Sequence, residues 1–155
     1  MAMDELEQRV WQRVLAQREL PQERSELKLL MLEAMERKNI LYRIFGVASG
    51  KQKKLLSKLL AGEEETIACL RGMCRLAGVD TGKEKAVSAR KEQPRKLLQQ
   101  CYYRSCRAMA EYTARSAESE FGVIFLKMAE RQRTLCAMVA ELLGQWESKD
   151  KMGKR

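Results

Sequence analysis

Residues 59–70 read LLAGEEETIACL, and residues 127–138 read KMAERQRTLCAM. The two stretches align without gaps, and both carry apolar residues three or four positions apart, the spacing of one face of an α-helix. They lie near the middle of two longer helical segments. This internal similarity predicts two helical hairpins of the same kind.

A polar residue interrupts the apolar stripe at the same place in both stretches, Glu64 in the first and Gln132 in the second. Three positions later each stretch has an apolar residue, Ile67 or Leu135. A polar group that faces a core costs on the order of a few kcal/mol unless it is paired. We therefore expect Glu64 and Gln132 to form a buried hydrogen-bonded pair, or a polar contact at the edge of a bundle.

Helical periodicity extends over most of the chain, in which strong helix formers dominate and only two prolines and nine glycines occur. The pattern predicts five helices, at about 4–18, 25–45, 51–77, 95–116 and 120–146. Gly78 follows the third of them, where a left-handed helix cap is expected. The inward stripe expected for the second helix consists of Leu27, Leu30, Met31, Ala34, Met35, Leu41, Tyr42 and Phe45.

The lengths of the connections select an architecture. Helices two and three are joined by a short turn, and so are helices four and five, which makes each pair antiparallel. The link between these hairpins, from Gly78 to Pro94, is long and has no clean period. One long crossover predicts an all-α, ferritin-like four-helix bundle. We expect three parts: an N-terminal amphipathic helix (1–20), the bundle (21–147) and a basic flexible tail (148–155).

Composition narrows the classes of function. No apolar run approaches the roughly 20 residues of a membrane span, and the acidic start lacks the apolar region of a signal peptide, so we expect a cytoplasmic protein. The five cysteines lie within helical patterns and form no C-x-x-C pair, which favours small buried side chains in a reducing compartment. The chain has no histidine, which excludes Ser-His and Cys-His nucleophile pairs.

The formal net charge of +9 raises the question of nucleic acid. The excess gathers in three regions, 51–58, 83–96 and 149–155, and no aromatic residues alternate with the basic ones. We therefore favour a solvated basic face, with sequence-blind phosphate binding as the alternative.

Across residues 25–146 the chain resembles the rubrerythrin branch of the ferritin-like family, which carries A-x-x-E-x-x-H on its second and fourth core helices. Residues 61–67 (AGEEETI) and 129–135 (AERQRTL) follow this frame. The resemblance implies a di-iron site whose ligands are those Glu and His residues, with one further Glu from each of the other two helices.

The ligands of that site are mostly missing from this sequence. Glu64 is retained, but Ile67 and Leu135 stand in the two His positions and Gln132 replaces the second Glu. On the first core helix Glu36 lies one position off the expected place. The third offers no carboxylate near residues 104 and 105. We expect no cofactor and a degenerate site at Glu36, Glu64, Ile67, Gln132 and Leu135 that is sealed by hydrocarbon.

These features favour a non-enzymatic binding or oligomerisation module, with the N-terminal helix as a face for a second copy or a protein partner. The alternative is a metal-binding or redox protein of the rubrerythrin class that uses a shifted ligand set. Its ligands would be Glu36, Glu64 and Glu65 with the thiol of Cys69 or Cys136, and it would hold iron or another metal.

Overall fold

The structure, a computed structural model, describes residues 21–81 and 92–153, with side chains described for 26–81 and 92–146. In this part of the chain it consists of four α-helices and no strand: α2 (Pro21–Phe45), α3 (Gly50–Leu76), α4 (Pro94–Glu118) and α5 (Gly122–Gly153). The expected N-terminal helix lies outside the described residues. None of the described helices is long and apolar enough to cross a membrane.

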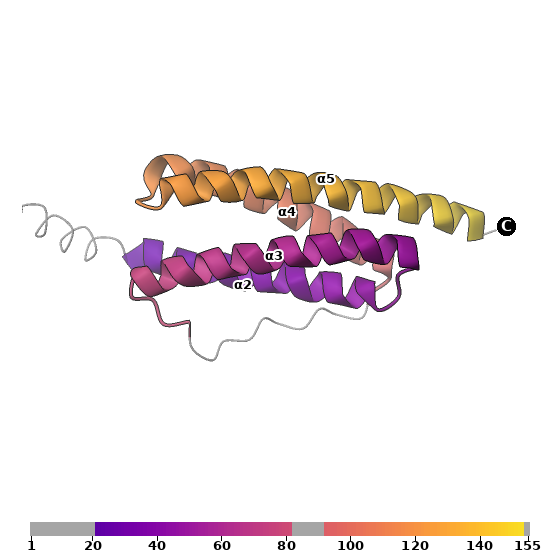
Figure 1. Cartoon of the computed structure of the whole chain (residues 1–155), viewed down its shortest axis with the longest axis horizontal. Helices are drawn as coiled ribbons and strands as arrows, with labels where there is room; N and C mark the ends of the chain where they lie inside the picture. Colours follow the sequence, from indigo (N-terminus) through magenta and orange to yellow (C-terminus); the bar gives the residue numbers. More distant parts are fainter. Residues whose placement is uncertain (1–20, 82–91, 154–155) are drawn as a thin grey trace, which may run out of the picture.

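The helices form two antiparallel hairpins, α2–α3 and α4–α5, stacked as two layers (Figure 1). Helix α2 packs against α3 and α4, and α5 packs against α4 and α3. Helices α2 and α5 run in one direction, and α3 and α4 run in the other (Figure 1). The end of α3 and the beginning of α4 therefore lie at opposite ends of the bundle.

Local signals in the sequence set the helix ends. Before α3, the backbone N–H of Ser49 donates to Oε1 of Gln52 at 2.9 Å, which is half of a capping box. Beyond α3, Gly78 has φ of 71°, and the N–H of Val79 reaches back to the carbonyl of Cys74 at 2.8 Å. The left-handed cap predicted at Gly78 is confirmed.

Most helix boundaries match the periodicity to within a few residues, and the largest difference is at the C-terminus. Helix α5 continues to Gly153, seven residues beyond the predicted end at Trp146. The residues after Trp146 include no proline, and Lys and Glu favour helix. The segment expected as a flexible tail is therefore helical over most of its length.

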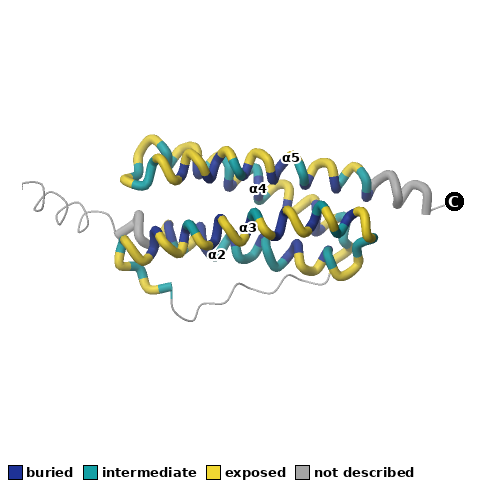
Figure 2. Tube along the Cα trace, in the orientation of Figure 1, coloured by how far each residue is buried: buried dark blue, intermediate teal, exposed yellow. Residues whose placement is uncertain are grey.

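Buried side chains line the inner sides of all four helices (Figure 2). In α3 the buried apolar residues are Leu56, Leu59, Leu60, Ile67, Leu70, Met73 and Cys74. In α2, however, Tyr42 is 52% exposed, although the sequence pattern placed it inside. Ile44 is buried in its place, because the stripe of α2 continues through Ile40, Leu41 and Ile44.

The apolar core is divided into two clusters. One lies where α3 ends and α5 begins, and includes Leu30, Leu70 and Phe125. The other lies towards the opposite end, and includes Ile44, Leu59 and Leu142. The boundary between the clusters falls near the middle of every helix.

Candidate functional site

A layer of polar side chains separates the two apolar clusters, and each helix contributes one residue. These residues are Arg37 from α2, Glu63 from α3, Ser105 from α4 and Gln132 from α5, and each is at most 1% exposed. On every helix the polar residue continues the spacing of the buried apolar residues on either side of it. We call these four residues the polar layer.

The centre of the polar layer is an ion pair between Arg37 and Glu63. The Nε atom of Arg37 donates to both carboxylate oxygens of Glu63, at 3.1 and 3.2 Å. Its Nη2 atom donates to the hydroxyl oxygen of Tyr112, on α4, at 3.1 Å. The Nε2 atom of Gln132 donates to Oε1 of Glu63 at 3.2 Å. The guanidinium and the carboxylate thus connect all four helices, directly or through one partner.

Electrostatics keep the buried guanidinium of Arg37 charged. Burial alone would lower the pKa of Arg37, but the carboxylate of Glu63 and the oxygen of Tyr112 outweigh it and raise that pKa above its usual range. Burial raises the pKa of Tyr112, against the opposing effect of the Arg37 charge, so its hydroxyl stays neutral. A buried charge pair is stable only when its remaining hydrogen-bonding positions are also satisfied.

One buried oxygen near this centre, Oε1 of Gln132, has no hydrogen-bond partner among the described residues. The Nε2 donor of Gln132 is used by Glu63, which leaves the amide oxygen on the other side. The network is therefore satisfied at Arg37 and Glu63 and incomplete at its periphery.

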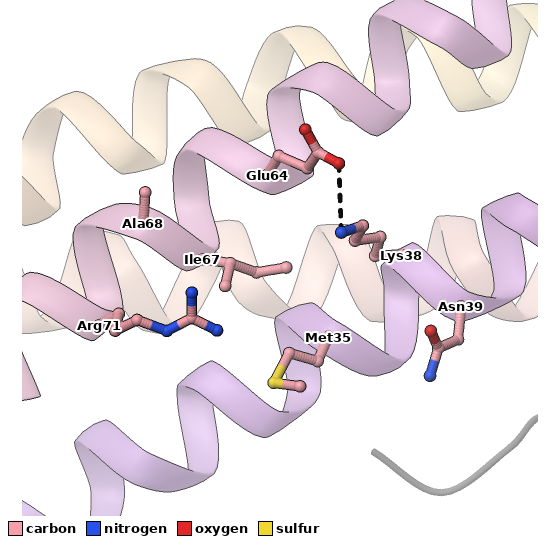
Figure 3. A pocket seen from close by; sticks show the side chains of 7 residues that line it. All are labelled: Met35, Lys38, Asn39, Glu64, Ile67, Ala68 and Arg71. Atoms are coloured by element: carbon pink, nitrogen blue, oxygen red, sulfur yellow. Dashed lines mark ion pairs between the residues drawn. The ribbon is translucent and has the colours of Figure 1, made fainter. Parts of the chain in front are cut away.

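The sequence interpretation of Glu64 was wrong by one residue. Glu64 is 54% exposed and pairs with Lys38 of α2, Oε1 to Nζ, at 3.2 Å, beside Ile67 and Met35 (Figure 3). The buried partner of Gln132 is Glu63. A shift of one residue turns a helix face by about 100°, and three consecutive glutamates gave the alignment no way to choose between them.

The three glutamates of α3 have three different partners. Glu63 pairs with the buried Arg37, Glu64 with Lys38 at the surface, and Glu65 with Nε of Arg131, on α5, at 3.2 Å. Because successive helical residues point in different directions, one glutamate run links α3 to both of its neighbours.

The burial pattern also corrects the register of the internal repeat. Equivalent buried positions in α3 and α5 are Leu60 and Ala129, Glu63 and Gln132, and Ile67 and Cys136. The sequence alignment had paired each α3 residue with the residue one position earlier in α5. The internal repeat is therefore present as an apolar stripe that one polar residue interrupts in each helix. Its correct register is the one in which the buried positions of α3 and α5 correspond.

Two of the remaining site residues are buried as predicted. Ile67 belongs to the cluster near the end of α3, whereas Leu135 belongs to the other cluster. Leu135 packs over Gly62, where an added Cβ would lie 2.6 Å from its Cδ2 atom. Hydrocarbon therefore flanks the polar layer on both sides.

The shifted metal-ligand set is not brought together in the structure. Glu36 pairs with Nη1 of Arg104 at 2.9 Å, and Glu64 and Glu65 have the separate cationic partners given above. Cys69 is half-buried on α3, whereas Cys136 is buried on α5. Within the described ranges no group of three potential ligand side chains is suitably placed for a metal ion.

The sequence analysis missed Arg37, Glu63 and Tyr112. A signal for the first two was present: Arg37 lies three residues after the buried Ala34, and Glu63 lies three after the buried Leu60. Both continue an apolar stripe as a charged interruption. Of the basic segments considered for nucleic acid, residues 83–91 and 154–155 lie outside the described residues, and the side chains of 149–153 are not described. No protein-family model, curated protein or solved structure matches this chain.

Proposed function

We propose that this chain is a ferritin-like bundle without a di-iron centre, in which an arginine–glutamate pair occupies the position of the metal ions, and that it acts as a non-enzymatic binding module. The helix order, with two hairpins whose link joins opposite ends of the bundle, supports the ferritin-like part of the proposal.

The observation that carries the proposal is the engagement of both oxygens of Glu63 by Nε of Arg37. In a carboxylate-bridged site those oxygens would bind the metal ions. Here a guanidinium contributes a permanent positive charge at the same atoms, and a cation entering beside it would be repelled. Gln132 lies at a position where the family resemblance puts a ligand, Ser105 lies in the corresponding region of α4, and Arg37 lies two positions from the ligand place on α2.

A closed centre leaves the outer surface for binding. The bundle exposes large apolar side chains near the end of α3 and the beginning of α5, among them Leu76, Val123 and Leu126. Exposed apolar groups that gather at one end of a domain are typical of contact surfaces.

Metal titration of the full chain tests the proposal. We expect protein purified without chelator to contain far less than one iron, manganese or zinc ion per chain, and we expect added Fe²⁺, Mn²⁺ or Zn²⁺ to leave its thermal midpoint unchanged. The matched variant is Glu63→Gln, because it removes the only buried carboxylate among the described residues. Stoichiometric metal that survives desalting and is lost in Glu63→Gln would refute the proposal.

A further inference from the structure

A groove of about 350 Å³ lies between α3 and α5, on the flank of the bundle where α3 ends and α5 begins. Its apolar wall is formed mainly by Cys69, Met73, Leu76, Ile124 and Met128. Leu76 is 75% exposed, so a molecule in the groove would cover apolar surface that now faces water. Covering a large apolar side chain contributes about 1.5–3 kcal/mol.

The same groove has a cationic side. Lys127 and Arg131 lie one helical turn apart on α5, and both line the groove. Lys127 is exposed and makes no ion pair with any residue in the described ranges. Arg131 uses Nε for Glu65, and its side chain is 30% exposed where it lines the groove.

Apolar and cationic groups are ordered along the groove. It begins with Leu76 and Ile124 at the end of the bundle and finishes at Arg131, next to the polar layer. From Ile124 to Arg131, α5 rises about 10 Å. A ligand of this length would meet hydrocarbon at one end and positive charge at the other.

We infer that this groove binds small amphiphilic carboxylates, of the class of medium-chain fatty acids. The carboxylate is held by the positive charges of Lys127 and of the partly exposed Arg131 side chain, and the aliphatic chain lies along Met73 and Met128 towards Leu76. The size of the groove favours a small molecule over a protein segment, since small-ligand sites span about 300–1,000 Å³. This inference gives a ligand class to the proposed binding role and uses no residue of the polar layer.

Methionine methyl NMR on the full chain tests the inference, with sodium octanoate as the probe. We expect saturable shifts at Met73 and Met128, which line the groove, and no shift at Met109 on α4. Octanol lacks the charged head and acetate lacks the chain, so both are expected to bind at least tenfold more weakly than octanoate.

Two variants separate the parts of the site. Arg131→Gln removes the cationic end and is expected to weaken octanoate binding at least tenfold, whereas Arg133→Gln, an exposed position on the same helix, leaves binding unchanged. Gly72→Leu introduces a side chain where nothing lies within 4 Å of an added Cβ, so it fills the groove without distorting the helix and abolishes binding. Far-UV circular dichroism checks that each variant is folded.

Several results would overturn the inference: octanoate that shifts neither Met73 nor Met128, shifts spread evenly over all methionines, or equal affinity in Arg131→Gln. If the two signals move with protein concentration alone, a second copy covers the groove. If they move in Trp11→Ala without ligand, the N-terminal segment covers it. Either of these two results would rule out the fatty-acid site. If octanoate causes no shifts and added metal leaves the thermal midpoint unchanged, only this inference is refuted and the proposed function still stands.

Discussion

Arg37 and Glu63 form a buried ion pair in the middle of the bundle, with Nε of the guanidinium 3.1 and 3.2 Å from the two carboxylate oxygens and each residue 1% exposed. The pair joins α2 to α3, and its further bonds to Tyr112 and Gln132 extend it to α4 and α5. These two further bonds link the α2–α3 hairpin to the α4–α5 hairpin between the two apolar clusters.

Replacing one residue of this pair should lower the free energy of unfolding far more than replacing both residues together. Arg37→Met and Glu63→Leu each leave one buried charge uncompensated, so each is expected to lower the free energy of unfolding by about 3–5 kcal/mol. The double variant replaces both charges with hydrocarbon and should lie within about 1 kcal/mol of the original or above it. Urea unfolding followed by circular dichroism gives the free energy of unfolding of the original protein, the two single variants and the double variant.

Lys38→Met is the matched control, since Lys38 pairs with Glu64 at the surface, one residue from the buried pair on both helices. Its loss should stay below about 1 kcal/mol. A double variant as unstable as the sum of the two single ones would show that the charges do not compensate each other.

The hydroxyl of Tyr112 contributes as an acceptor. Tyr112→Phe keeps the ring, whose centroid lies 6.1 Å from that of Phe125, but leaves Nη2 of Arg37 without its partner. We expect a loss of about 1–3 kcal/mol in the free energy of unfolding, the cost of an unpaired buried donor. Tyr103→Phe, at a 75% exposed position on the same helix, should change stability by less than about 0.5 kcal/mol. Equal effects of the two substitutions would argue against the hydrogen bond.

Glu33 gives the bundle a pH dependence. Burial and then repulsion from Glu111 raise its pKa, while Arg107, Arg37 and Arg104 oppose the shift. The folded state therefore holds this proton more tightly than the unfolded state. Its stabilising contribution is complete below the unfolded pKa of about 4.3 and is lost as pH rises through the higher folded value.

Glu33→Gln removes this titration. Relative to the variant, the original protein should lose stability as the pH rises above the unfolded pKa of Glu33, because ionising Glu33 is less favourable in the folded state. The difference between urea midpoints of the two proteins, measured across this rise in pH, reports the effect. A difference that does not vary with pH, or that has the opposite slope, would contradict it.

The cysteines should differ in reactivity. Burial, together with the charge of Glu63, raises the pKa of Cys101 to about 12, and burial, together with Cys106, raises that of Cys136 to about 12. Because the thiolate is the nucleophile, both should resist iodoacetamide in the folded protein at about pH 8. Cys69 and Cys106 are half-buried and should be alkylated first.

Peptide mass spectrometry of protein sampled during alkylation gives the order of reaction. Unfolding in urea is the control, and it should bring all five cysteines to similar rates. Modification of Cys101 as fast as Cys69 in the folded chain would mean that the core around the polar layer opens readily.

Much of the architecture could be predicted from local patterns. Periodic apolar residues predicted the existence and approximate bounds of α2 to α5, and Gly78 predicted the cap after α3. The contrast between short turns and one long link predicted the pairing into hairpins. The end of α5 was predicted too early, at residue 146, whereas the helix continues to Gly153.

What the sequence by itself determined is which residues form helices and that one polar position interrupts the apolar stripe of α3 and of α5. Only the tertiary structure decided which of three adjacent glutamates is buried, and that its partner is an arginine on another helix. The reason is physical: helix formation depends on near neighbours in the chain, whereas burying a charge depends on an opposite charge being available across the core. Arg37 provides that charge to Glu63 although the two residues are 26 positions apart in the chain. Local sequence patterns do not predict a pairing over such a separation.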